Sequence, residues 1–270
     1  MCRHLAYLGP EEPLGRLLVD PGHSLYRQSW APRRQRHGTV NADGFGVGWY
    51  AREDPQPARY RRAGPIWADR SFADLARVVR TGALLAAVRD ATLAGADGEA
   101  AAAPFAAGRW LFSHNGSIPG WPQAVTSLVP LLPAADLLSM EARTDSAFVW
   151  ALVLHRLRSG APPGTALAET VLQIAEAAPA ARLNLLLTDG ATIAATAWGD
   201  SLWHLSEPGR TVVASEPYDD DPRWREVPDR SLLVATDRGV THAPVGEPVE
   251  NLAGNAVEAP ASASPKEPCT

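Results

Sequence analysis

The most constraining feature of this 270-residue sequence is a series of short apolar runs in its second half, separated by turn dipeptides. Asp189-Gly190 and Gly199-Asp200 are dipeptides of the kind that join antiparallel strands. They predict an antiparallel meander with strands at residues 183–187, 192–198, 202–205 and 211–214. Two later runs, at residues 231–235 and 240–243, predict a final hairpin.

The rest of the chain adds a few helices and further strands. We expect strands at residues 2–8, 45–50, 84–88 and 110–113, with an ordered, arginine-rich loop over 21–44. We expect helices from Ser71 as N-cap to Arg80, over 146–158 after Thr144 and Asp145, and over about 165–177. Helices flanking many antiparallel strands predict a layered α+β fold and argue against alternating βαβ units.

The composition of the chain changes at about residue 247. Beyond that point Ala, Pro, Ser and Glu dominate and aromatic residues are absent. Such a segment does not bury enough apolar surface to fold. We therefore expect one folded domain over residues 2–246, followed by a disordered tail over 247–270 that includes Cys269.

Charge and hydropathy exclude several classes of protein. The chain has 25 Lys and Arg against 30 Asp and Glu, a net charge of −5, so we expect no nucleic-acid partner. The longest apolar run, 147–154, is far too short to span a bilayer, and no secretory leader precedes it. Its two cysteines form neither a disulfide framework nor a CxxC motif. We expect a cytoplasmic protein without a membrane partner.

The first candidate for chemistry is Cys2, directly after the initiator methionine. Removal of Met1 would give Cys2 a free α-amine, whose usual pKa of about 8 suits a base at neutral pH. A thiol with a base on the same residue is a competent nucleophile. The alternative is that Cys2 is a small apolar residue at the end of the chain.

Further candidates follow predicted strands. Asn115-Gly116, after the run 110–112, is either a turn or a pair of oxyanion donors. Arg89 offers a planar fork for a carboxylate. Asp145 either binds an ammonium group or caps the following helix. The glycines at 44, 46 and 48 indicate backbone crowded against a neighbour or ligand.

No histidine spacing points to a metal site. Cys2 and His4 would share one face of a strand, which is only a weak metal hypothesis. The chemistry of the other candidates requires neither a metal nor a cofactor.

The order of these motifs is informative. Five motifs occur in a fixed order: Cys2, Asn-Ala-Asp-Gly-Phe-Gly at 41–46, Arg89-x-x-Thr92, His114-Asn115-Gly116 and Thr144-Asp145-Ser146. Together they resemble the class II glutamine amidotransferases. These are N-terminal-nucleophile hydrolases, and the resemblance covers about residues 2–243. It implies a four-layer αββα sandwich, with two antiparallel sheets between helical layers.

The resemblance also implies roles for individual residues. Cys2 would be the nucleophile, and Asn115 with Gly116 the oxyanion hole. The γ-glutamyl head of a small-molecule amide would be held by Arg89, Thr92, His114 and Asp145. Many relatives carry His where this chain has Ala87, which suggests a reshaped pocket beside the glutamyl site.

Longer strings at 1–4, 30–35 and 214–221 resemble the amidohydrolases of ergothioneine biosynthesis. That resemblance implies a γ-glutamyl-hercynylcysteine sulfoxide substrate, whose trimethylammonium group suits an aromatic face. The candidate aromatics are Trp30, Trp49, Trp67 and Tyr218, whereas Trp150 and Trp198 are expected in the core. Two alternatives remain: a glutaminase subunit that supplies ammonia to a partner synthetase, and a catalytically inactive binding protein.

Overall fold

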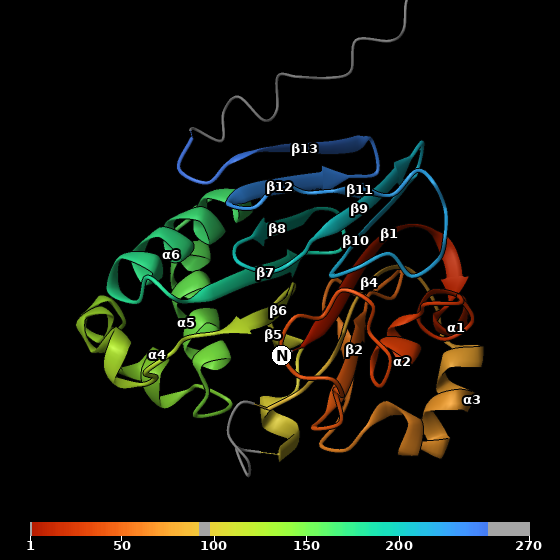
Figure 1. Cartoon of the computed structure of the whole chain (residues 1–270), viewed down its shortest axis with the longest axis horizontal. Helices are drawn as coiled ribbons and strands as arrows, with labels where there is room; N and C mark the ends of the chain where they lie inside the picture. Colours follow the sequence, from red (N-terminus) through yellow and green to blue (C-terminus); the bar gives the residue numbers. More distant parts are fainter. Residues whose placement is uncertain (1, 92–97, 248–270) are drawn as a thin grey trace, which may run out of the picture.

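The computed structural model describes residues 2–91 and 98–247. Two antiparallel sheets lie face to face between two groups of helices (Figure 1). The first sheet has the strand order β11-β9-β10-β1-β4-β2-β3, and the second has the order β13-β12-β8-β7-β6-β5. The strand that follows Cys2 therefore lies in the middle of the first sheet.

The first sheet includes the strands expected near residues 2–8, 45–50, 84–88, 202–205 and 211–214, together with two short polar strands, β3 and β11, that were not expected. Its strands are β1 (Arg3–Pro13), β2 (Phe45–Trp49), β3 (Ala58–Arg62), β4 (Arg80–Val88), β9 (Trp203–Glu207), β10 (Arg210–Ala214) and β11 (Arg225–Glu226). The second sheet consists of β5 (Phe105–Ala107), β6 (Trp110–Ser117), β7 (Arg182–Thr188), β8 (Ile193–Ala197), β12 (Ser231–Thr236) and β13 (Gly239–Pro244).

Each sheet carries its own helices. Those that contact the first sheet are α1 (Leu14–Leu18), α2 (Leu25–Gln28) and α3 (Arg70–Val78). Those that pack on the second are α5 (Asp145–Arg158) and α6 (Pro163–Ala177). The remaining helical segments are η1 (Ile66–Ala68), η2 (Gly98–Ala101), η3 (Gln123–Leu131) and α4 (Ala134–Leu138).

The alternation of side chains along the strands divides the core into three layers. In β1, Leu5 and Tyr7 pack toward the helices of the first sheet, whereas Ala6 and Leu8 pack between the sheets. In β7, Leu185 and Leu187 pack against the side that carries α5 and α6. Two helical layers and two sheets around three apolar layers confirm the expected αββα sandwich.

The predicted meander is wrong in one respect. Strands β7 and β8 pair around Asp189-Gly190, but β9 and β10 belong to the other sheet. The chain changes sheets at Gly199-Asp200 instead of turning back within one sheet. Turn chemistry predicts that the chain reverses, but the partner of the next strand depends on residues far away in the sequence.

Other boundaries differ by a few residues. Helix α3 begins after Asp69, whose carboxylate accepts hydrogen bonds from the N–H groups of Ser71 and Phe72, so Asp69 and not Ser71 is the N-cap. The loop expected at 21–44 contains the short helix α2. The hairpin of β12 and β13 is confirmed.

The proposed boundary at residue 246 stays a prediction, because residues 248–270 lie outside the described part of the chain. Within the described ranges, no helix combines the length and apolar character needed to cross a membrane.

Candidate active site

A cavity of about 340 Å³ opens where the first residue of the described chain meets the ends of both sheets. Antiparallel pairing of Arg3 with Val88 puts Cys2 beside Arg89, since one precedes β1 and the other follows β4. The wall is completed by η2, by the end of β6 and by the start of α5. The lining residues are Cys2, Arg89–Ala91, Ala101, Gly116–Trp121 and Arg143–Ser146.

The Cys2 thiol is half-buried at this cavity and is a free cysteine. Burial raises the pKa of the Cys2 thiol, while the charge of Arg89 and a hydrogen bond from the backbone of Asp90 oppose that shift. A thiol with a raised pKa is a poor nucleophile without a nearby base. An amine on the same residue would meet that requirement.

Arg89 is held by the segment that precedes β2. Its backbone N–H donates to Gly44 (2.8 Å), and the backbone N–H of Asp43 donates to the Arg89 carbonyl (2.9 Å). The Arg89 guanidinium also donates to the Asp43 carbonyl (3.1 Å). The Asp43 carboxylate in turn accepts from the N–H of Ala91 (2.8 Å). The Asn-Ala-Asp-Gly motif therefore fixes the chain on which Arg89 sits.

The glycines after this motif are crowded by neighbouring chain, as expected. A Cβ at Gly46 would lie 2.4 Å from the carbonyl oxygen of Ala103, and one at Gly48 would lie 2.7 Å from the side chain of Leu111. Glycine lets β2 approach these neighbours closely.

Asp145 lies at the opposite wall, at the start of α5. Thr144 is the N-cap and accepts a hydrogen bond from Ala147 (3.2 Å), so the capping role belongs to Thr144. The Asp145 carboxylate accepts from the N–H of Ile118 (3.0 Å) and from that of Ser146 (2.7 Å). It is thereby fixed in the cavity wall together with the segment that follows β6.

The sequence Asn115-Gly116 is not a turn, because β6 continues through it. Asn115 pairs with Asn184 and Gly116 pairs with Leu183 of β7. A Cβ at Gly116 would lie 1.8 Å from the Arg182 carbonyl oxygen, so only glycine fits here. A close approach between strands, and not a reversal of the chain, explains this glycine.

Asn115 is buried beneath the cavity, beside Cys2. In the amide orientation that satisfies both ends of its side chain, Nδ2 donates to the Cys2 carbonyl (2.5 Å) and Oδ1 accepts from Arg3 (3.3 Å). The Ser215 hydroxyl lies 3.3 Å from the same amide. The Asn115 amide and the backbone of Gly116 thus lie close to the nucleophile.

His114 is also buried and does not line the cavity. Its Nε2 lies 2.9 Å from the carbonyl oxygen of Arg182 and so donates to it, which leaves Nδ1 to accept from the Ser146 hydroxyl (3.0 Å). The structure therefore shows His114 joining β6, β7 and α5. Its predicted contact with substrate stays a prediction, and Thr92 lies outside the described residues.

Comparison with known proteins agrees with this geometry. Residues 19–209 match the family of class II glutamine amidotransferases. The chain is 43% identical, over 91% of its length and 100% of the relative, to the gamma-glutamyl-hercynylcysteine sulfoxide hydrolase of Mycolicibacterium smegmatis. The chain belongs to the class II glutamine amidotransferases.

Solved structures share the fold. A glutamine aminotransferase class-II domain protein from Silicibacter pomeroyi superposes with a TM-score of 0.65 and 25% identity, covering 91% of this chain and 100% of that one. The glutamine phosphoribosylpyrophosphate amidotransferase of Bacillus subtilis superposes with a TM-score of 0.60 and 17% identity, over 92% of this chain and 50% of that one. The second likeness concerns the fold alone.

The four aromatic residues that were candidates for contact with a trimethylammonium group do not line the cavity of this amidotransferase. Trp30 and Trp67 are partly exposed and contact each other edge to face, with 5.7 Å between their centroids. Trp49 and Tyr218 pack in the core of the first sheet. Trp150 is buried against Phe112, and Trp198 packs against the same core, as expected.

The aromatic side chain that does line the cavity is Trp121, which the sequence analysis did not single out. It packs against Phe148 with 5.4 Å between ring centroids. Its position shortly after the His-Asn-Gly motif was the one feature of the sequence that could have indicated its place at the site. In the described part of the chain, no cluster of three His, Cys, Asp or Glu side chains is suited to hold a metal ion.

Proposed function

We propose that this chain is an amidohydrolase that releases glutamate from γ-glutamyl-hercynylcysteine sulfoxide through a thioester on Cys2. The observation that carries the proposal is the cavity that unites Cys2, Arg89, Gly116 and Asp145. It occurs in a chain 43% identical to a hydrolase named for that substrate.

The chemistry begins with removal of Met1, which frees the α-amine of Cys2. The amine takes the thiol proton while sulfur attacks the γ-carbonyl carbon, forming a C–S bond. The Asn115 amide and the Gly116 N–H stabilise the oxyanion, and loss of one such donor typically costs about 10²–10³ in rate. The α-ammonium then protonates the departing nitrogen as the C–N bond breaks. Water hydrolyses the thioester to glutamate and restores the thiol.

Arg89 and Asp145 position the substrate in this proposal. The Arg89 guanidinium binds the α-carboxylate of the glutamyl head as a planar fork. The Asp145 carboxylate, already oriented by two backbone N–H groups, accepts from the α-ammonium. Thr92 and His114 complete the predicted set. Holding the γ-carbonyl in line with sulfur is a large part of such catalysis.

Trp121 is the residue we assign to the cationic end of the substrate. It is the tryptophan among the cavity-lining residues, and the face of an indole ring attracts a trimethylammonium group. The reaction requires no cofactor or metal, and we propose that it takes place in the cytoplasm.

The test is glutamate release from γ-glutamyl-hercynylcysteine sulfoxide and from free glutamine, measured side by side with Cys2→Ala as control. We expect a strong preference for the sulfoxide conjugate and no release by the variant. A preference for glutamine would instead identify a glutaminase that supplies ammonia to a partner synthetase. Release by neither would contradict both functions and favour a binding protein.

A further inference from the structure

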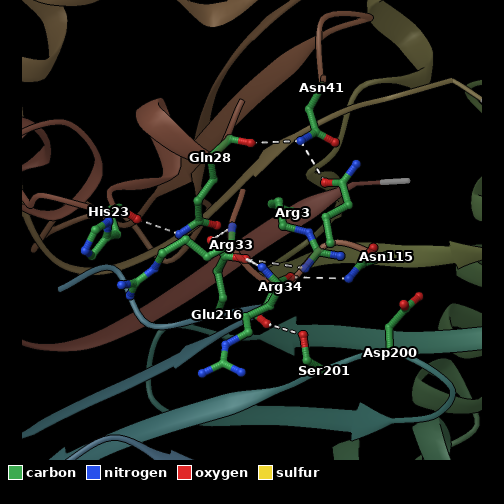
Figure 2. A network of polar contacts seen from close by, with 12 residues as sticks. Arg3, His23, Gln28, Arg33, Arg34, Asn41, Asn115, Asp200, Ser201 and Glu216 are labelled. Carbon is green, nitrogen blue, oxygen red and sulfur yellow. Dashed lines mark hydrogen bonds and ion pairs between the residues drawn. The ribbon is translucent and has the colours of Figure 1, made fainter. Parts of the chain in front are cut away.

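Arg3 is the residue next to the nucleophile, and its charged side chain is completely buried. Its Nε donates to the Cys2 carbonyl oxygen (2.9 Å). Its Nη2 lies 3.3 Å from the amide oxygen of Asn115 in the orientation that satisfies that amide. In this amide orientation, one guanidinium touches both the backbone of the nucleophile and the side chain of the oxyanion donor. Figure 2 shows Arg3 near Asn115 and Glu216.

The third nitrogen of this guanidinium faces Glu216, which is equally buried. Nη1 of Arg3 lies 4.0 Å from Oε2 of Glu216 and has no hydrogen-bond partner among the described residues. The Glu216 carboxylate is itself fixed, because its oxygens accept from the backbone N–H groups of Arg33 (2.9 Å) and Arg34 (2.7 Å). The counter-charge of Arg3 is thus held in place by the loop between α2 and β2.

A buried pair with this geometry is a costly way to stabilise a fold. Desolvation lowers the pKa of Arg3, and the charges of Glu216 and Asp200 only partly compensate. An apolar side chain would fill the same space without that cost. Fold stability alone therefore does not explain a guanidinium at this position, and its function is to be sought in the groups that it contacts.

That role follows from the donors of the guanidinium. Arginine has five N–H donors and no acceptor, so it can meet Asn115 only through the amide oxygen. The amide NH₂ group is then turned toward Cys2 and donates one N–H to its backbone carbonyl, which leaves the second N–H for the oxyanion of the proposed mechanism. A carboxamide turned the other way would present an oxygen to a developing negative charge and oppose the reaction.

We propose that Arg3 is a positioning residue of the hydrolytic site, which orients the Asn115 carboxamide while Glu216 fixes its guanidinium. The inference rests on the proposed function, since it assigns Asn115 the oxyanion role. Lysine cannot replace Arg3, because a single ammonium nitrogen cannot reach the Cys2 carbonyl, the Asn115 amide and Glu216 in the same planar arrangement.

The test is a double-mutant cycle with Arg3→Lys and Asn115→Ala, using γ-glutamyl-hercynylcysteine sulfoxide as substrate. We expect Arg3→Lys to lower kcat about 100-fold while KM changes less than about threefold, because Arg89 and Asp145 are unaltered. In the Asn115→Ala background the same substitution should cost less than about threefold. Arg3→Met, which keeps volume without charge, should behave like Arg3→Lys.

The matched control is Arg156→Lys. Arg156 is also largely buried, and it joins α5 to α6 through Glu169 and Gln173, away from the cavity. Its replacement should affect thermal stability without affecting kcat.

The outcomes separate this inference from the proposed function. If the wild type releases no glutamate, the proposed function fails before Arg3 is tested. If the wild type is active, an undiminished kcat in Arg3→Lys overturns the positioning role. Equal costs in both Asn115 backgrounds, or loss of folding in both Arg3 variants, would assign Arg3 to stability and overturn it as well.

Discussion

The Asp145 carboxylate accepts a hydrogen bond from the backbone N–H of Ile118, so the start of α5 and the segment after β6 form one wall of the cavity. This bond also distinguishes Asp145 from a simple helix cap, which is the role of Thr144. An acid held in this way keeps its orientation before any ligand arrives.

Asp145→Asn should raise KM for γ-glutamyl substrates about 10- to 100-fold, because the bond to the substrate ammonium loses its charge. The control is Asp69→Asn, since Asp69 caps α3 with two N–H bonds and does not line the cavity. That variant should have an unchanged KM, and its asparagine oxygen can still cap α3. Steady-state kinetics and thermal melting of both variants check the prediction, and an unchanged KM in Asp145→Asn would restrict Asp145 to joining α5 to the segment after β6.

Trp121→Ala should raise KM for γ-glutamyl-hercynylcysteine sulfoxide about 2- to 30-fold, which corresponds to the usual strength of a cation–π contact. KM for glutamine, which has no trimethylammonium group, should change less than about twofold. Trp67→Ala is the control, because Trp67 is partly exposed and absent from the cavity wall. Equal increases for both substrates would argue that Trp121 only shapes the cavity.

Gly116→Ala should destabilise the fold by about 3 kcal/mol or abolish folding, since its Cβ would collide with the backbone of β7. Gly22→Ala is the matched control, because an added Cβ there has open space and the free energy of unfolding should change by less than about 0.5 kcal/mol. Urea denaturation measures both. A stable Gly116→Ala protein would show that β6 and β7 can separate.

Acid should destabilise the protein through His4. Burial lowers the pKa of His4 to about 3, so between that pH and the usual value near 6.5 the unfolded chain binds a proton that the folded chain does not. Stability is therefore complete above pH 6.5 and falls as the pH falls. Between pH 7 and pH 5, protonation of this histidine in the unfolded chain should lower the free energy of unfolding by about 2 kcal/mol.

The measurement is urea unfolding at the two pH values for the wild type and for His4→Gln, which removes the titrating ring. Between pH 7 and pH 5, the free energy of unfolding of the wild type should fall by about 2 kcal/mol more than that of the variant. An identical pH dependence in the two proteins would show that His4 is not responsible.

The sequence predicted elements better than it predicted their partners. Helix α5 and strands β7, β8, β10, β12 and β13 were expected within a few residues, because periodicity and turn dipeptides are local signals. The change of sheet at Gly199-Asp200 leaves no such local mark. It depends on β10 pairing with β1, which lies near the start of the chain.

The candidate site shows the same division. The motif order led to Cys2, Arg89, Gly116 and Asp145, and these four do line one cavity. Trp121 was missed because the chain has nine tryptophans, and only the folded structure shows which of them lines the cavity. Gly116 was open to interpretation as a turn, because the Arg182 carbonyl that excludes a side chain comes from a distant strand.

The first residues of β1 are joined to the segment that follows β10. The His4 N–H donates to the Ser215 hydroxyl (3.0 Å), and the Ser215 N–H donates to the His4 carbonyl (2.9 Å). A polypeptide emerging from the ribosome therefore presents Cys2 first and its surroundings last. Until Ser215 and Glu216 have emerged, β1 lacks one of its two neighbouring strands and Arg3 lacks its counter-ion. The surroundings of Cys2 therefore become complete only when most of the folded part of the chain has been synthesised.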